Sequence, residues 1–225
     1  MPRVVGLVGG LGVGATVHYY ESLVRAIAAR NMTPGIVISH ADMKCVLGWV
    51  EAKAIEDLAE YLAKHIERLS RAGAALAAIP AVAPHICAAE LKRKIGLPLI
   101  DLTECVANEL AARGARTAAI LGTRFVMQSD MYGRLSGIKI VHPDAASVEF
   151  VHTNYMQIAS TGSANSADVE GIRRIAKRLA SEEGVDVVIL AGTELSLAFN
   201  EADCGFPALD CARVHIDAIA MAATK

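Results

Sequence analysis

The sequence has few aromatic residues, no long apolar run and no excess of charge of one sign. Phe, Trp and Tyr together make up 4% of the 225 residues. No stretch of 18 apolar residues occurs, so we expect no membrane span. Lys and Arg number 22 against 24 Asp and Glu, without a basic stripe, so we expect no nucleic-acid partner. The first residues form neither a positive region nor an apolar leader, so we expect no signal peptide.

Cysteine is present but in no pattern typical of a disulfide framework or a zinc site. The five cysteines are an odd number and no two form a C-x-x-C pair. Reduced thiols are typical of cytoplasmic proteins, so we expect a cytoplasmic location and no metal ion. The cysteines are at positions 45, 87, 105, 204 and 211.

Short apolar runs alternate with amphipathic stretches, which predicts an α/β fold with mostly parallel sheets flanked by helices. The predicted strands are residues 3–9, 35–40, 75–80, 97–100, 117–122, 139–141, 185–191 and 208–210. The predicted helices are residues 16–30, 54–72, 85–95, 103–112, 126–135, 148–160, 167–183 and 211–223.

The chain contains an internal repeat. The segment from Leu7 to Leu11 aligns with the segment from Ile120 to Arg124, and in the same register Thr16 falls on Ser129 and Tyr19 on Tyr132. A second pair of strands ends at Ala81 and at Gly192. The intervals agree, since 72 positions separate Gly9 from Ala81 and 70 separate Gly122 from Gly192.

The repeat predicts two pseudo-symmetric lobes with a cleft between them, in which Ala81 and Gly192 face each other. We assign residues 1–102 and 210–225 to the first lobe, and residues 103–209 to the second. The alternative is one continuous doubly wound sheet without duplication.

Motifs along the chain resemble those of the aspartate/glutamate racemase family. That family carries Gly-Ala-Asp, a strand and Cys-Asn-Thr-x-His in its first half, where this chain has Gly73 to His85. Its second half carries Gly-Ala-Asp, a strand and Gly-Cys-Thr-Glu, where this chain has Gly184 to Glu194. Further segments similar to the family's are residues 6–11, 121–127 and 210–215.

The resemblance implies a cofactor-independent enzyme acting on a small carboxylate, an amino or hydroxy acid. In that family one cysteine from each lobe moves the α-proton, because a thiol pKa can be tuned towards neutrality. This chain has Ala81 and Gly192 at those two positions, and Val82 and Ala83 replace the companion Asn and Thr. Racemisation by two thiols is therefore not expected. The family often pairs its subunits, so we expect a homodimer.

The polar residues retained at the predicted strand ends are the candidates for acid and base. They are His85, Glu194 and Asp42, although each also has a structural interpretation as a capping or turn residue. Cys87 and Cys45 lie nearby, but a packed or uninvolved thiol is the simpler interpretation. The predicted substrate-binding residues are Gly10, Leu11, Thr16, Val82, Ala83, Thr123, Arg124 and Thr193.

Three functions remain open at this point. The first is an isomerase, epimerase or C–C lyase of the racemase superfamily that uses residues other than cysteine. The second is a catalytically inactive homologue that only binds a small acid. The third is an NAD-dependent oxidoreductase, because residues 10–15 also fit the dinucleotide pattern G-x-G-x-x-A and Asp42 would then contact the ribose.

Overall fold

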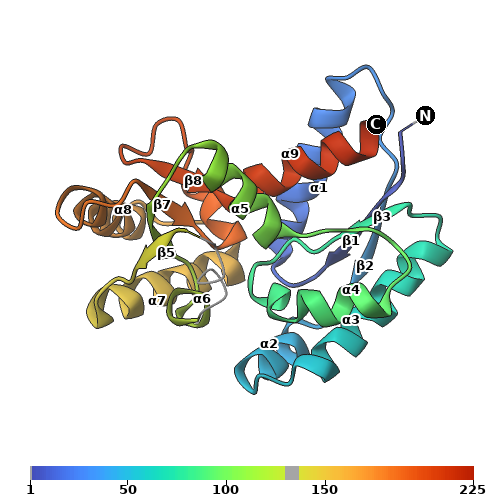
Figure 1. Cartoon of the computed structure of the whole chain (residues 1–225), viewed down its shortest axis with the longest axis horizontal. Helices are drawn as coiled ribbons and strands as arrows, with labels where there is room; N and C mark the ends of the chain where they lie inside the picture. The colour runs from blue at the N-terminus through green and yellow to red at the C-terminus, as the bar shows by residue number, and fades with distance from the viewer. Residues whose placement is uncertain (1, 130–136) are drawn as a thin grey trace. The chain divides into compact units, whose positions relative to one another are not determined.

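The computed structural model describes residues 2–129 and 137–225 (Figure 1). The chain forms two compact units, Met1–Cys105 with His215–Lys225, and Val106–Val214. These boundaries differ by a few residues from the division expected at 102/103 and 209/210. Each unit contains a four-stranded parallel sheet with flanking helices, so the predicted two-lobe α/β fold is confirmed.

Unit 1 has the strand order β2-β1-β3-β4. Its strands are β1 (Val5–Gly9), β2 (Ile36–His40), β3 (Leu76–Ala78) and β4 (Leu99–Ile100). Its helices are α1 (Val13–Ala28), α2 (Met43–Glu51), α3 (Ile55–Arg71), the 3₁₀ turn η1 (Ala83–Cys87) and α4 (Ala88–Lys94). The helix α5 (Leu102–Ala112) leaves this unit and α9 (Cys211–Thr224) returns to it.

Unit 2 has the equivalent strand order, β6-β5-β7-β8. Its strands are β5 (Thr117–Leu121), β6 (Lys139–Val141), β7 (Val187–Leu190) and β8 (Ala208–Asp210). Its helices are α6 (Arg124–Gln128), α7 (Ala145–Thr161), α8 (Ser166–Ser181) and the 3₁₀ turn η2 (Thr193–Leu197). The same order of strands in both units is what an internal duplication predicts.

The sheet register supports the repeat at the level of single residues. Val5 pairs with Leu76 across β1 and β3, and Ala118 pairs with Val187 across β5 and β7. The two sequence alignments place Val5 over Ala118 and Leu76 over Val187. Residues that the two alignments treat as equivalent are therefore paired in the same way in both sheets. Ala81 follows Leu76, and Gly192 follows Val187, by the same number of positions. Tyr132, which the alignment paired with Tyr19, lies outside the described residues.

The buried faces follow from helical and strand periodicity. Along α3, Leu58, Leu62, Ile66 and Leu69 recur every three or four residues and are all buried. Figure 1 shows α1 on one face of the unit 1 sheet and α3 with α4 on the other. The strands β1 and β7 are buried on both faces, which explains why they are runs of apolar residues without alternation.

Three sequence-based element predictions need correction. Helix α2 was not predicted, although Asp42 is a good N-cap and Val46 and Val50 form its buried face. The helix expected over residues 85–95 is a 3₁₀ turn followed by α4, and it begins earlier, with Pro84 in the first turn. The helix expected over residues 126–135 begins as α6 at Arg124, and the part beyond residue 129 lies outside the described residues.

Candidate functional site

The end of strand β7 in unit 2 holds a buried cluster of side chains that carry protons. Thr193 and Glu194 begin the turn η2 directly after Gly192, and each is only 1% exposed. The Tyr155 hydroxyl, from α7, donates a hydrogen bond to Glu194 Oε2. Thr193 Oγ1 donates to the same carboxylate oxygen at 3.1 Å. Two hydroxyl groups therefore converge on one carboxylate oxygen.

Burial governs the protonation of this cluster. It raises the pKa of Glu194 above its ordinary value, although the hydrogen bond from Tyr155 opposes the shift. Burial and the neighbouring Glu194 carboxylate raise the pKa of Tyr155 well above its ordinary value. Tyr155 therefore stays protonated at neutral pH, and Glu194 binds a proton more readily than a carboxyl group in water.

Tyr155 also occupies the space next to Gly192. A Cβ atom built on Gly192 would lie 2.8 Å from Tyr155 Cδ2 and 3.1 Å from Cζ, and nearer still to Cε2. Real Cβ atoms essentially never come as close to other heavy atoms as this Cβ would to Cδ2 and Cε2. The tyrosine ring thus fills the volume that any side chain at position 192 would need.

The end of strand β3 in unit 1 carries no comparable group. Ala81 and Val82 are buried, at 7% and 5% exposure, and Ala83 begins the turn η1. None of these three side chains can hold a proton or donate a hydrogen bond. The two equivalent strand ends of the repeat therefore differ in their chemistry.

His85 uses both of its ring nitrogens to bind backbone groups. Nδ1 lies 2.9 Å from the Ala81 carbonyl oxygen, and Nε2 lies 3.2 Å from the Leu102 amide nitrogen. The contacts require a neutral ring that donates from Nδ1 and accepts at Nε2. Burial lowers the pKa of His85, which agrees with a neutral ring. In this arrangement His85 joins the end of β3 to the start of α5.

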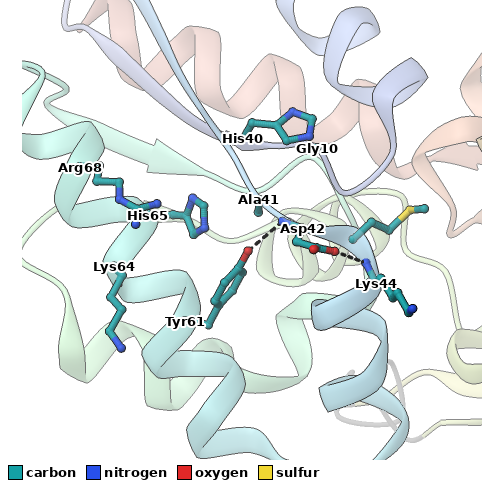
Figure 2. A pocket seen from close by; sticks show the side chains of 10 residues that line it. Gly10, His40, Ala41, Asp42, Lys44, Tyr61, Lys64, His65 and Arg68 are labelled. Carbon is teal, nitrogen blue, oxygen red and sulfur yellow. Dashed lines mark hydrogen bonds between the residues drawn. The ribbon is translucent and has the colours of Figure 1, made fainter.

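Asp42 borders a pocket within unit 1 and caps helix α2. Its Oδ1 accepts hydrogen bonds from the amides of Lys44 at 2.8 Å and Cys45 at 3.2 Å. These amides, that of Cys45 first, lower the pKa of Asp42. Its own amide donates to the Tyr61 hydroxyl at 2.8 Å, a contact visible in Figure 2. Asp42 is therefore a charged capping residue at physiological pH.

The pocket beside Asp42 has a volume of about 660 Å³ and lies at the carboxyl ends of β1 and β2. Parallel sheets bind ligands at this edge. Figure 2 shows Tyr61, Lys64, His65 and Arg68 of α3 on one side of Asp42. The residues around the pocket are Gly10, His40, Ala41, Asp42, Met43, Lys44, Tyr61, Lys64, His65 and Arg68.

Positive charge dominates this pocket. Lys44, Lys64 and Arg68 face a single carboxylate, Asp42, which the α2 amides already bind. Lys64 lies 3.5 Å from Glu60, whereas Lys44 and Arg68 make no ion pair with any residue that the structure describes. His65 is 3% exposed, and its Nδ1 lies 2.8 Å from the Ser39 hydroxyl. Such a pocket suits a ligand with an anionic group.

The predicted binding residues of the first glycine turn are engaged within the turn. Gly10 has φ +87°, and a Cβ there would lie 2.5 Å from the Ala41 carbonyl oxygen, so the turn requires glycine. The Gly10 amide donates to Thr16 Oγ1 at 3.0 Å, and that hydroxyl donates to the Gly12 carbonyl at 2.8 Å. Leu11 is half-buried beside them. Only Gly10 of this group borders the pocket.

The predicted binding residues after β5 also have partners within unit 2. Thr123 caps helix α6 by accepting a hydrogen bond from the Val126 amide at 3.3 Å. The Arg124 guanidinium binds the Glu149 carboxylate with two hydrogen bonds, of 2.6 and 2.7 Å. Arg124 therefore already clamps a carboxylate, one from this chain.

The cysteines and the acidic residues form no metal site in the described part of the chain. Within residues 2–129 and 137–225, no three His, Cys, Asp or Glu side chains gather closely enough to hold an ion. Burial raises the pKa of Cys87 to about 12, and its thiol donates to the Pro84 carbonyl. The Cys45 thiol is exposed on α2. None of the helices in the described residues is long and apolar enough to cross a bilayer.

Sequence reasoning missed Tyr155 and the basic side of the pocket. The spacing of Tyr61, His65 and Arg68 along the predicted helix would have placed them on one face. Tyr155 left no comparable signal, because it lies 39 positions before Glu194. Its helix was predicted, but its neighbours depend on the fold.

Comparison with known proteins covers almost the whole chain. The model of the Asp/Glu/hydantoin racemase family matches residues 8–219. A candidate Asp/Glu racemase from Yersinia pestis has a similar crystal structure, with a TM-score of 0.85 and 25% identity over 98% of this chain and 99% of that one. An aspartate racemase homologue from Pyrococcus horikoshii has a TM-score of 0.84 and 26% identity over 99% and 100%.

Arylmalonate decarboxylase shares the fold at a greater distance, with a TM-score of 0.58 and 16% identity over 100% of this chain and 93% of that one. The family match spans both halves of the repeat, including the ends of β3 and β7. The chain therefore belongs to the Asp/Glu/hydantoin racemase family.

Proposed function

We propose that this protein acts on a small carboxylate, an amino or hydroxy acid, without a cofactor and without a pair of catalytic thiols. The family match supports racemase-like chemistry on such acids. The proposal that no pair of thiols takes part rests on the residues present at the two repeated strand ends. Ala81 and Gly192 stand where the family motifs have cysteine, and neither can move a proton.

Glu194 is the candidate acid or base that the geometry favours. It follows Gly192 directly, is buried, and has a raised pKa, which brings a carboxyl group closer to the pH at which general acid–base catalysis works best. His85 and Asp42 also remain candidates by position. Their observed contacts favour a positioning role for His85 and a capping role for Asp42.

The charge of the unit 1 pocket supports an anionic ligand. Arg68 and Lys44 have no ion-pair partner among the residues that the structure describes, and an anionic group of a ligand bound to unit 1 would supply one. The dinucleotide alternative is less favoured, because the Gly10 amide in that turn binds Thr16.

The proposed function predicts exchange of a substrate α-proton with solvent. The protein is incubated in D2O with a panel of small amino and hydroxy acids, and deuterium at Cα is measured by mass spectrometry and proton NMR. We expect exchange with at least one acid, and loss of that exchange in Glu194→Gln. Glu194→Gln keeps the shape of the side chain and removes its ability to carry a proton. Arg71→Gln, on the exposed side of α3, serves as the control.

The other outcomes separate the alternatives. Binding of an acid without exchange by any member of the panel would identify a binding-only homologue and contradict the proposed enzyme. Loss of carbon dioxide from a malonate-type acid would identify a lyase. Tight binding of NADH would favour the oxidoreductase.

A further inference from the structure

We propose that Tyr155 takes the place of the second catalytic thiol and works with Glu194 as a proton-transfer pair. This inference rests on the proposed function and names the side chain that makes it possible. Three observations within unit 2 carry it: where the ring lies, what its hydroxyl binds, and which member of the pair lies beside Gly192.

The ring lies where a cysteine side chain would begin. A Cβ at Gly192 would collide with Cε2 and Cδ2 of the Tyr155 ring and would be in tight contact with Cζ. A cysteine at position 192 and Tyr155 in its present place are therefore mutually exclusive. Glycine at position 192 is what allows the ring to pack there.

The hydroxyl at the end of that ring is hydrogen-bonded to a buried carboxyl group that can accept its proton. It donates to Glu194 Oε2, the oxygen that also accepts from Thr193. Glu194 is 1% exposed, whereas Tyr155 retains 9% exposure. The three heavy atoms nearest a Cβ built at Gly192 all belong to the Tyr155 ring, so Tyr155 is the member of the pair that lies beside that position.

Proton transfer through this pair balances in both directions. In abstraction, the Tyr155 oxygen takes the α-proton from the substrate carbon while its own proton passes to the Glu194 carboxylate. The C–H bond breaks, its electron pair stays on the substrate as an enolate, and Glu194 ends protonated. In donation the steps reverse: Tyr155 protonates the carbon, and Glu194 returns a proton to the phenol oxygen.

Unit 1 has no equivalent pair at its repeated position, since Ala81, Val82 and Ala83 cannot carry a proton. Of the family's two catalytic positions, only the one in unit 2 thus has a proton-transfer group beside it in this chain. We therefore expect the protein to exchange or deliver a proton on one face of its substrate, with retention of configuration, instead of equilibrating two enantiomers.

The first test removes only the Tyr155 hydroxyl. Exchange at Cα is measured for Tyr155→Phe with the acid that the wild-type protein exchanges, and Tyr20→Phe on the exposed face of α1 is the matched control. We expect kcat for exchange to fall about 100-fold or more with KM nearly unchanged, the usual effect of losing a general acid or base. Exchange by Tyr155→Phe within threefold of wild type would overturn the role of the hydroxyl and leave the proposed function standing.

The second test needs no substrate. We expect Gly192→Ala to lower the thermal midpoint by roughly 2–10 °C in the wild-type background, because the added methyl group displaces the ring. In a Tyr155→Leu background the same substitution should change the midpoint by no more than about 1 °C. Equal shifts in both backgrounds would overturn the placement of the ring. If the wild-type protein exchanges no acid at all, the proposed function and the proton-transfer role both fail, while this coupling still decides the placement.

Discussion

Replacing Glu194 with Gln should make the protein more stable relative to wild type as the pH rises, while it abolishes exchange. The folded protein holds the Glu194 proton more tightly than the unfolded chain does, since burial raises the carboxyl pKa. Above the ordinary pKa of 4.5, the wild-type protein therefore loses stability with rising pH until Glu194 ionises in the folded state. Gln carries no charge, keeps a carbonyl oxygen for the Tyr155 hydroxyl, and removes this loss.

Urea unfolding at pH 5 and pH 8 measures the effect. The unfolding free energy of the variant minus that of wild type should increase with pH, on the order of 1 kcal/mol per pH unit. This slope applies at pH values where Glu194 is ionised in the unfolded chain and still protonated in the folded protein. The rate of exchange should fall by roughly 10²–10⁴ at both pH values. A substitution that raises the free energy of unfolding and lowers the rate of the reaction is typical of a catalytic residue. Parallel pH curves for the two proteins would contradict the assignment.

Unit 1 should be sensitive to acid because of a buried pair of neutral histidines. His215 Nδ1 lies 3.1 Å from the Tyr19 hydroxyl, and Nε2 lies 2.8 Å from the Ile100 carbonyl oxygen. Burial and the neighbouring His85 lower the pKa of His215 to about 3. The ring of His85 lies 6.0 Å away, and burial lowers its pKa as well.

Both histidines are protonated more readily in the unfolded chain, where the ordinary pKa is 6.5. Stability is therefore fully present above pH 6.5 and is lost as the pH falls toward the folded value of about 3. We expect His215 alone to contribute a loss of about 2 kcal/mol between pH 7 and pH 5, measured by urea unfolding.

His215→Gln should be less stable than wild type at pH 7 and should depend less on pH between 7 and 5. The exposed Gln157, whose side chain carries no titratable group, supplies the control, Gln157→Ala, which should keep the wild-type pH dependence. An unchanged slope for His215→Gln would contradict a neutral buried imidazole. The Glu194 effect has the opposite sign over this range, so the two variants separate the contributions.

The fold was readable from the sequence because its signals are local. Strands β1, β5 and β7 are short apolar runs with a glycine or alanine as the last residue or directly after it, and the duplicated order of the strands follows from the repeat. Helix α2 was missed because it is short and half-exposed, so its only clear signals are the Asp42 cap and two buried valines.

The site was readable only in part, because its chemistry depends on contacts distant in sequence. The alignment located Gly192, but it could not show that a ring from α7 fills the space beside it. His85 looked like a free acid or base, yet its ring nitrogens bind the Ala81 carbonyl and the Leu102 amide, the latter 17 positions away. Arg124 similarly looked like a substrate clamp until its pairing with Glu149 was visible.

The central claim is that proton transfer in this family member does not depend on cysteine. It is tested most directly by α-deuterium incorporation in five single variants, in which Cys45, Cys87, Cys105, Cys204 and Cys211 are each replaced by Ala. Circular dichroism and the thermal midpoint identify the variants that keep the fold. The account predicts that every folded variant exchanges within about threefold of wild type, whereas Tyr155→Phe and Glu194→Gln do not. A folded cysteine variant that loses exchange by about 100-fold would contradict it.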